Sequence, residues 1–385
     1  MKNSDKTGKN NTQFLKIKKK NAASFLKLIK NKFSDEVVID KRKKVIQDGS
    51  YVLFPLIEKI ANLNWLLESD VSNLNLEIIK GRGELDPNYK FHSVEEALLG
   101  EIPEDIIDII PKSYDVIGKI AIIEFDQVSW LRIDKPLLYK KKVAEAIAKV
   151  NKGVETVYEK RSEVKGNYRL KDLEVIYGED NPKTTHKENN CTFKLDVKNT
   201  YFTPRLVFER KRLSLLDFVK NEVIVDMFAG VGPISIQIAK NHDVKIYSFD
   251  INSVAYKYLI ENIKSNKLRG EIFAHNIDIT ELTNSTNTLG TYLRNKVDRI
   301  IMNLPEQSIN YLDTACFLMK ESGGILHLYQ FCEKPNAIEK GIENLRLTLK
   351  NNRWQIKKVI NSKIVKSFSP KSDLIIVDAK IESIS

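Results

Sequence analysis

The pattern of apolar and polar positions changes near residue 206. From there to the C-terminus, short apolar runs alternate with segments in which apolar residues recur at helical spacing, which is typical of a parallel α/β sheet. The expected strands lie near 222–228, 245–249, 271–275, 298–303, 324–331 and 373–380. In open sheets of this class, ligands bind beside the carboxyl ends of the strands, so residues at those ends are the first candidates for a site.

The residues before this point predict smaller domains. Residues 137–152 place apolar side chains on one side and lysines on the other, as in an amphipathic helix, and residues 117–125 are typical of a buried strand. Several short strands with turn signals follow as far as Pro204. We therefore expect a small acidic domain over 35–110, an intermediate α+β domain over 111–205 and the sheet domain over 206–385.

Charge is distributed unevenly over the 385 residues, whose formal net charge is +11. Residues 1–34 hold ten lysines and one acid, and their polar, aperiodic sequence predicts a largely disordered basic arm. One short part of it, residues 23–33, has helical spacing and could fold on a partner. Residues 139–212 carry a further excess of seven positive charges. Because clustered positive charge attracts polyanions, a nucleic acid is the expected class of partner.

Composition argues against several classes of protein. No apolar stretch approaches the roughly 20 residues of a membrane helix, and lysines interrupt the apolar runs near the N-terminus, which disfavours a secretory signal. The three cysteines and five histidines show no paired or metal-ligand spacing, so neither a disulfide framework nor a metal site is expected. We expect a reducing, cytoplasmic location. A mitochondrial transit peptide is the alternative for the arm, although such peptides favour arginine and this arm uses lysine.

The most specific local signal is an apolar strand that ends in a glycine-containing turn before a helix. Its candidate cofactor residues are Asp226, Phe228, Gly230 and Gly232. Glycine lets the backbone approach a ligand closely, and the N-terminus of the following helix favours partial negative charge. Asp250 closes the next strand, where a carboxylate can accept both hydroxyls of a ribose. The pattern predicts a nucleoside-binding site.

Two details distinguish between cofactors. A dinucleotide fingerprint would require a third glycine where this chain has Ser235, and an acid, Asp226, ends the first strand, so the pattern suits S-adenosylmethionine better than NAD. Asp278, at the end of the third strand, is a weaker candidate that could bind the adenine. The alternative is an ordinary corner between strand and helix whose acids are caps, with Asp278 a solvated loop acid.

A second motif ends the fourth expected strand at the same edge of the sheet. It contains Asn303, Leu304 and Pro305, and an amide together with carbonyls freed by the proline can read a base edge as donor and acceptor. Methyltransferases that act on exocyclic amines resemble a motif with a second proline and an aromatic residue, where this chain has Leu304 and Glu306. A ring nitrogen is therefore the better target, and no cysteine stands near the loop for carbon-5 chemistry on pyrimidines. The alternative is a plain turn.

Basic residues interleaved with aromatic ones precede the sheet domain. One cluster surrounds Arg169, and the other contains Tyr201, Arg205 and Arg210. This combination suits RNA, because phosphates attract cations and splayed bases stack on aromatic rings. The alternative for each cluster is a solvated charged face, and Glu209, which lies among arginines, could equally be the centre of a structural ion-pair cluster.

Taken in order, these motifs resemble those of the archaeal and eukaryotic tRNA (guanine-37-N1) methyltransferases. The likeness runs from about residue 114 to the C-terminus and includes residues 201–205, 226–233, 303–305 and 366–370. It implies a Rossmann-like class I methyltransferase domain with a mostly parallel seven-stranded sheet, preceded by an RNA-binding domain and a small domain that recognises tRNA shape. It further implies S-adenosylmethionine as cofactor, tRNA as partner and monomeric action on the guanosine 3′ to the anticodon.

The resemblance also implies roles by position. Glu209 matches the family's proposed general base, Arg169 its transition-state stabiliser and Asp250 its ribose carboxylate, whereas Tyr201 and Asn303, with the backbone at Pro305, match contacts to the target base. Guanine N1 must lose a proton before it can attack, and negative charge then builds on O6, so the site needs a base near N1 and donors near O6. We expect partial burial to raise the pKa of Glu209.

Two alternatives keep parts of this interpretation. The nearer one retains the fold and cofactor but transfers the 3-amino-3-carboxypropyl group, as the wyosine-pathway transferases do. Those enzymes look different at the position of Asn303 and lack the context of Glu209. The other alternative is a tRNA-binding module without catalysis, and the presence of every proposed catalytic residue argues against it.

Overall fold

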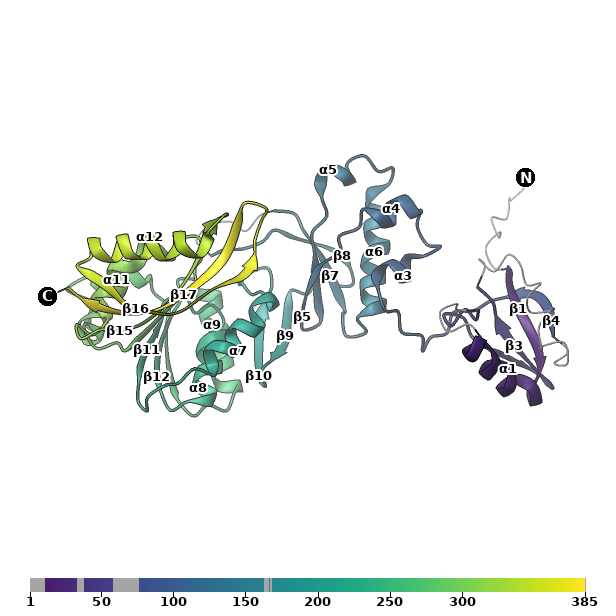
Figure 1. Ribbon diagram of the computed structural model, residues 1–385, viewed down its shortest axis with the longest axis horizontal. Helices are drawn as coiled ribbons and strands as arrows, with labels where there is room; N and C mark the ends of the chain where they lie inside the picture. The colour runs from purple at the N-terminus through teal and green to yellow at the C-terminus, as the bar shows by residue number, and fades with distance from the viewer. Residues whose placement is uncertain (1–10, 33–37, 58–75, 163–165, 167, 385) are drawn as a thin grey trace. The chain divides into compact units, whose positions relative to one another are not determined.

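The computed structural model describes residues 11–32, 38–57, 76–162, 166 and 168–384, and it divides the chain into two compact units, Met1–His92 and Ser93–Ser385 (Figure 1). This division falls N-terminal to the boundary expected at residue 110. The reason is a short helix, α3 (Val94–Leu98), which packs on the long helix α6 (Pro136–Val150) and so ties its segment to the second unit. Both sides of the boundary expected at residue 205 lie within the second unit, so that division stays a prediction.

The first unit contains a four-stranded antiparallel sheet and a helix. In spatial order the strands are β2 (Ile46–Asp48), β3 (Tyr51–Pro55), β1 (Asn11–Lys18) and β4 (Glu77–Arg82), and α1 (Lys19–Lys32) follows β1. The prediction of a disordered arm was therefore wrong for residues 11–32. Leu15, Ile17 and Phe25 are buried in the core of the unit, while the lysines between them remain at its surface. The other residues of the expected arm, 1–10, 33 and 34, lie outside the described residues.

The second unit begins with an α+β segment. Its sheet has the order β5 (Tyr114–Ile117), β6 (Ile120–Ile123), β7 (Thr156–Lys160) and β8 (Leu173–Tyr177), and its helices are α3, α4 (Glu104–Asp108), α5 (Gln127–Trp130) and α6. The single strand expected over 117–125 is instead a hairpin, because Gly118 adopts a φ of 58° and turns the chain between β5 and β6. A second hairpin, of β9 (Lys183–Glu188) and β10 (Cys191–Asp196), follows.

A seven-stranded sheet forms the rest of this unit. Its spatial order is β13 (Glu271–His275), β12 (Lys245–Phe249), β11 (Val223–Asp226), β14 (Arg299–Met302), β15 (Gly324–Glu333), β17 (Ser372–Ser383) and β16 (Trp354–Ser367). The first five strands are parallel, and β17 runs antiparallel to both of its neighbours, β15 and β16. The α/β class and the six expected strands are confirmed. β16 was not expected, because most of its side chains are exposed or half-buried at the sheet edge and form no apolar run.

Helices connect these strands and cover both faces of the sheet (Figure 1). They are η2 (Pro204–Leu206), α7 (Val207–Ser214), α8 (Pro233–Asn241), α9 (Ser253–Ser265), η3 (Ile279–Thr283), α10 (Thr288–Leu293), η4 (Ser308–Tyr311), α11 (Leu312–Leu318) and α12 (Ala337–Asn351). Neighbouring residues of one strand, such as Ile224 and Val225, enter two different cores on opposite faces. Within the described residues, none of the helices has the length and apolar character needed to cross a bilayer.

The strand order reverses between β11 and β14. From β11 the chain builds outward through β12 to β13, and it then crosses back to place β14 on the other side of β11. At such a reversal the connecting segments leave in opposite directions and open a crevice beyond the strand ends. Asp226, Asp250 and Asn303 end or follow the strands β11, β12 and β14 at this crevice.

Gly232 shapes the turn between β11 and α8. It is the residue before the helix, with a φ of 87°, and Pro233 occupies the first helical position. A Cβ built on Gly232 would lie 2.4 Å from Leu259 Cδ1 and 3.0 Å from Ile236 Cδ1. Around a Cβ built on Gly230, whose φ is 57°, the nearest atom is the carbonyl oxygen of Tyr201 at 3.8 Å. Gly232 is therefore required by packing and backbone conformation, whereas Gly230 borders open space.

Alanine at position 232 should destabilise the sheet domain by about 1–3 kcal/mol, because it combines a left-handed backbone with a close contact to Leu259. We expect a lower midpoint of thermal unfolding for Gly232→Ala. Gly153→Ala is the matched control, since a Cβ there meets nothing within 4 Å, and its effect should stay within about 0.5 kcal/mol. Equal midpoints for the two variants would contradict the packing role of Gly232.

Candidate active site

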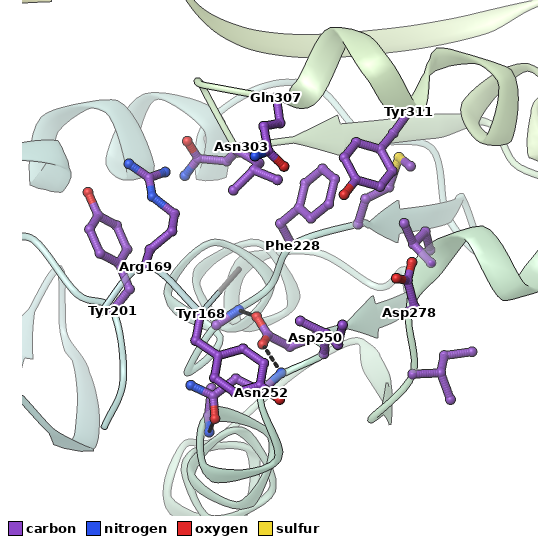
Figure 2. A pocket seen from close by; sticks show the side chains of 17 residues that line it. Tyr168, Arg169, Tyr201, Phe228, Asp250, Asn252, Asp278, Asn303, Gln307 and Tyr311 are labelled. Carbon is purple, nitrogen blue, oxygen red and sulfur yellow. Dashed lines mark hydrogen bonds between the residues drawn. The ribbon is translucent and has the colours of Figure 1, made fainter. Parts of the chain in front are cut away.

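A pocket opens at the carboxyl ends of β11, β12 and β14 (Figure 2). It is lined by loops of the sheet domain and by residues that precede that domain: Met227, Phe228, Gly230, Asp250, Ile251, Asn252, Ala255, Ile277, Asp278, Ile279, Asn303, Leu304, Gln307, Tyr311, Tyr168, Arg169 and Tyr201. The structure thus brings together seven predicted site residues: Phe228, Gly230, Asp250, Asp278, Asn303, Arg169 and Tyr201.

Asp250 is oriented by the backbone of two loops. Its Oδ2 accepts a hydrogen bond from the N–H of Gly230 at 2.6 Å, and its Oδ1 accepts one from the N–H of Asn252 at 2.8 Å. Burial raises the pKa of this carboxyl, and the two backbone donors oppose the rise. Each carboxylate oxygen has a second lone pair, so Asp250 can still accept the hydroxyls of a ribose from the pocket side.

Asp226 does not line the pocket, contrary to its predicted cofactor contact. Its side chain is fully buried below the loop, where Oδ2 accepts a hydrogen bond from Ser235 Oγ at 2.6 Å. Ser235 in turn accepts a hydrogen bond from Ser248 Oγ at 2.8 Å. Burial raises the pKa of Asp226 to about 6. The serine that replaces the third fingerprint glycine therefore joins the acid to β12, and both stabilise the turn from beneath.

An apolar slot occupies one end of the pocket. Phe228 and Tyr311 meet edge to face with ring centroids 5.1 Å apart, and Ile277 and Ile279 also line the pocket. Asp278 lies beside them and caps η3, accepting hydrogen bonds on Oδ1 from the N–H and Oγ1 of Thr280. The cap uses Oδ1 alone, so Asp278 combines its capping role with an Oδ2 that can accept from a ligand in the pocket. The slot offers apolar walls for a flat ring and a carboxylate for an exocyclic amine.

The other end of the pocket holds Arg169, Tyr201 and Asn303 (Figure 2). The guanidinium of Arg169 stacks 4.5 Å above the centre of the Tyr201 ring and contacts Glu306 at 3.3 Å. Its buried Nε has no hydrogen-bond partner among the described residues, and its φ is 54°. The Asn303 side chain points toward the Arg169 guanidinium in Figure 2. A cation and an amide are thus available at this end for a ligand atom that gains negative charge.

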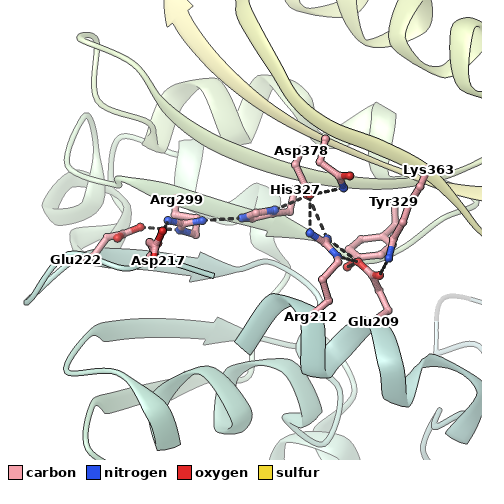
Figure 3. Close-up of polar contacts among 10 residues, drawn as sticks. Glu209, Arg212, Asp217, Glu222, Arg299, His327, Tyr329, Lys363 and Asp378 are labelled. Atoms are coloured by element: carbon pink, nitrogen blue, oxygen red, sulfur yellow. Dashed lines mark hydrogen bonds and ion pairs between the residues drawn. The ribbon is translucent and has the colours of Figure 1, made fainter. Parts of the chain in front are cut away.

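Glu209 lies outside the pocket lining, on α7, within a cluster of polar contacts (Figure 3). Its Oε1 accepts hydrogen bonds from Arg212 Nε at 2.8 Å and from Tyr329 Oη at 2.9 Å, and its Oε2 lies 2.7 Å from Lys363 Nζ. Burial raises the pKa of this carboxyl, but Arg212 and Lys363 outweigh burial and bring the pKa below its usual value. The expectation of a raised pKa was therefore wrong, and the carboxylate is ionised at neutral pH.

Three predicted RNA contacts are already used within the protein. Arg210 is buried and forms two hydrogen bonds of 2.5 Å to Glu188, so it cannot reach RNA directly and instead holds the carbonyl of Thr203. Arg205 Nε donates to Asp115 Oδ1 at 2.6 Å, although its side chain is half exposed. The carbonyl of Pro305 accepts a hydrogen bond from the Phe331 N–H at 3.1 Å, so it is not free to read a base.

Several residues of the site were not predicted. Tyr168, Asn252, Gln307 and Tyr311 line the pocket next to predicted positions, and their closeness in sequence was a usable signal. Lys363 carried no such signal, because it lies on the unexpected strand β16, far in sequence from the carboxylate it contacts. Among the described residues, no group of three or more histidine, cysteine, aspartate or glutamate side chains could hold a metal ion.

Known proteins resemble this chain over most of its length. Residues 184–357 match the TRM5/TYW2 methyltransferase domain, and residues 94–181 match the TYW2 N-terminal domain. The tRNA (guanine(37)-N(1))-methyltransferase Trm5b of Pyrococcus abyssi is 31% identical over 92% of this chain and 96% of its own. The tRNA(Phe) (4-demethylwyosine(37)-C(7)) aminocarboxypropyltransferase of Pyrococcus horikoshii is 28% identical over 75% of this chain and 96% of its own.

A solved structure agrees with these matches. The complex of aTrm5 and tRNALeu resembles this chain with a TM-score of 0.70 at 30% identity, and the match covers 95% of this chain and 99% of that one. These matches confirm the predicted family, the predicted class of enzyme and the predicted cofactor. The chain belongs to the TRM5/TYW2 methyltransferase family, and it is an S-adenosylmethionine-dependent enzyme.

Proposed function

We propose that this enzyme is a tRNA (guanine-37-N1) methyltransferase, acting as a single chain on the guanosine 3′ to the anticodon. The observation that carries the proposal is the extent of the likeness. Relatives named Trm5 match 92–95% of this chain, whereas the aminocarboxypropyltransferase matches 75% of it with nearly its whole length. The part of this chain that the aminocarboxypropyltransferase leaves unmatched is about as long as the first unit, Met1–His92. In length, this chain therefore resembles the relatives named Trm5.

The chemistry at one end of the pocket suits this reaction. Guanine N1 carries a proton at neutral pH, and its removal shifts negative charge to O6. Arg169, with an unpartnered buried Nε, and the amide of Asn303 would donate to that oxygen. Tyr201, already stacked under Arg169, would offer a ring beside the base.

The other end of the pocket suits the cofactor. Asp250 would accept the ribose hydroxyls, Phe228 and Tyr311 would contact the adenine, and Asp278 would accept its exocyclic amine. S-adenosylmethionine supplies an activated methyl group on a sulfonium. The protein then contributes by placing N1 in line with that group within about 3–3.5 Å, since alignment of the two reactants removes much of the barrier.

Glu209 is the proposed base. Its low pKa keeps the carboxylate charged at neutral pH, which is the form that can accept a proton. Tyr329, which donates to Glu209, lies on β15 directly after Leu328, and Leu328 pairs with Met302, the residue before Asn303. The carboxylate therefore lies one strand away from the proposed base-contacting amide.

A second candidate function is transfer of the 3-amino-3-carboxypropyl group from the same cofactor. The observation in its favour is the match of residues 94–181 to the TYW2 N-terminal domain. The two reactions move different parts of S-adenosylmethionine, so the position of an isotope separates them.

Methyl-labelled and carboxyl-labelled S-adenosylmethionine should each be incubated with tRNA transcripts that carry guanosine or adenosine at position 37. We expect the methyl label on the guanosine transcript alone, at N1. Transfer of the carboxyl label would favour the second candidate. Methyl label on both transcripts, or on neither, would contradict the proposed function.

Glu209→Gln should lower the single-turnover rate of methylation by about 10²–10⁴-fold, because the amide cannot accept the N1 proton. The affinity for tRNA should change less than about ten-fold, since the amide oxygen can still accept from Arg212 and Tyr329, and the partly exposed pair with Lys363 contributes about 1 kcal/mol or less. Glu382→Gln, which removes a half-buried carboxylate paired with Lys357, is the control and should keep the wild-type rate. A rate for Glu209→Gln near that of the wild type would eliminate Glu209 as the base.

A further inference from the structure

Both oxygens of the Glu209 carboxylate contact protein groups in the free protein (Figure 3). Arg212 on its own helix and Tyr329 on β15 donate to Oε1, while Lys363 on β16 pairs with Oε2. Asp378 on β17 is the remaining charged group of the cluster, and it faces Arg212 rather than the carboxylate. Oε2 is buried and makes no hydrogen bond, and Lys363 is its charged partner among the described residues, so the ammonium must move away before a substrate N–H can reach this oxygen.

The three contacts differ in how firmly they are anchored. Arg212 is fixed from its other side by Asp378, at 2.8 Å, and Asp378 accepts further hydrogen bonds from Asn361 at 2.9 Å and contacts His327 at 2.6 Å. Tyr329 is buried at 1% exposure. Removing either would leave a buried polar group without a partner, which costs about 1–3 kcal/mol or more.

Lys363 is different, because it can leave without this penalty. Its side chain is 41% exposed, and within the described part of the chain its ammonium pairs with Glu209 alone. An exposed ammonium is readily solvated or transferred to another anion, and exposed ion pairs of this kind contribute little. Oε2 is therefore the oxygen that can be released.

An RNA phosphate is the anion that the surroundings favour. Along the same strand, Lys366 lies near Arg205 and Arg169, and burial together with these two charges lowers the pKa of Lys366. Two acids offset these three cations, Asp115 through its pair with Arg205 and Glu306 through its contact with Arg169. The cations of this segment thus outnumber their acidic partners, and a polyanion that enters beside the pocket would meet Lys363 and Lys366 together.

We propose that Lys363 is a positioning residue that leaves Glu209 for a phosphate of the bound tRNA and thereby frees Oε2 to face guanine N1. The inference rests on the proposed function for the role given to Oε2, whereas the exchange itself is a property of tRNA binding. Binding of tRNA and release of the Glu209 carboxylate then occur together. Until tRNA binds, the negative charge of Glu209 stays paired with the Lys363 ammonium.

A binding cycle tests the exchange without any catalytic step. The affinity of a tRNA transcript with guanosine at position 37 should be measured for the wild type, Glu209→Gln, Lys363→Met and the double variant, over a series of salt concentrations. Glu209→Gln should bind about two- to five-fold more tightly than the wild type, because Lys363 is already free, and should have no effect when Lys363 is Met. Lys363→Met should flatten the dependence of log affinity on log salt by about 0.7–0.9. Lys363→Arg should retain the wild-type slope.

Lys357→Met is the matched control, because Lys357 forms a similar exposed pair on the same strand, with Glu382 at 2.6 Å. It should leave affinity and salt slope unchanged. An unchanged salt slope for Lys363→Met would overturn the exchange. Equal tightening by Glu209→Gln with Lys363 or with Met at position 363 would also overturn it, since general repulsion between Glu209 and RNA would then explain the tighter binding.

The pH dependence of single-turnover methylation gives a second readout. If Lys363 has left Glu209 in the reacting complex, the acid limb of the profile at saturating tRNA should be the same for the wild type and Lys363→Met. A limb displaced to higher pH in the variant would mean that Lys363 stays on the carboxylate, and the proposal would fall. A binding cycle that shows coupling while no methyl reaches guanosine would keep the exchange and reject the proposed reaction.

Discussion

One buried and one partly buried ion pair hold helix α7, and the geometry of the site depends on them. Arg210 reaches back to Glu188 on β9, and Arg212, two residues later, reaches across to Asp378 on β17. The helix thus bridges the hairpin that precedes the sheet domain and the antiparallel edge of the sheet itself. Breaking one buried pair by removing a single partner costs about 3–5 kcal/mol, so the helix has little freedom to rotate. Glu209, between the two arginines, is aimed by both.

Ion pairs within the protein also reduce the positive charge that the basic segment, residues 139–212, can offer to RNA. Several of its cations pair with acids that lie outside residues 139–212 and are not counted in the excess of seven charges, for example Arg205 with Asp115, Arg169 with Glu306 and Arg212 with Asp378. The formal excess of positive charge therefore overstates the surface that RNA can use. Positive charge free to bind a polyanion lies partly elsewhere, on β16, a strand whose sequence contains no clear periodic signal.

Apolar runs and glycine-containing turns were sufficient to predict the sheet domain, because burial on both faces of a parallel sheet leaves a strong and local signal. The same logic failed for β1, where Lys16 and Lys18 indicated solvent although Phe14, Leu15 and Ile17 are buried. The direction of the Glu209 pKa shift was predicted wrongly as well, since Lys363, which lowers this pKa together with Arg212, is more than a hundred residues away in sequence. Prediction succeeded where residues close in sequence determine the local structure, and it failed where partners distant in sequence determine the environment of a side chain.

The place of β1 inside its sheet has a consequence for how the protein is made. β1 pairs with β3 on one side and with β4 on the other, so it finds its first partner only after residue 55 has been translated and its second only after residue 82. Until then Phe14, Leu15 and Ile17 have no core to enter. The dense lysines around them repel one another and keep this waiting segment solvated, which protects an apolar strand from premature association during synthesis.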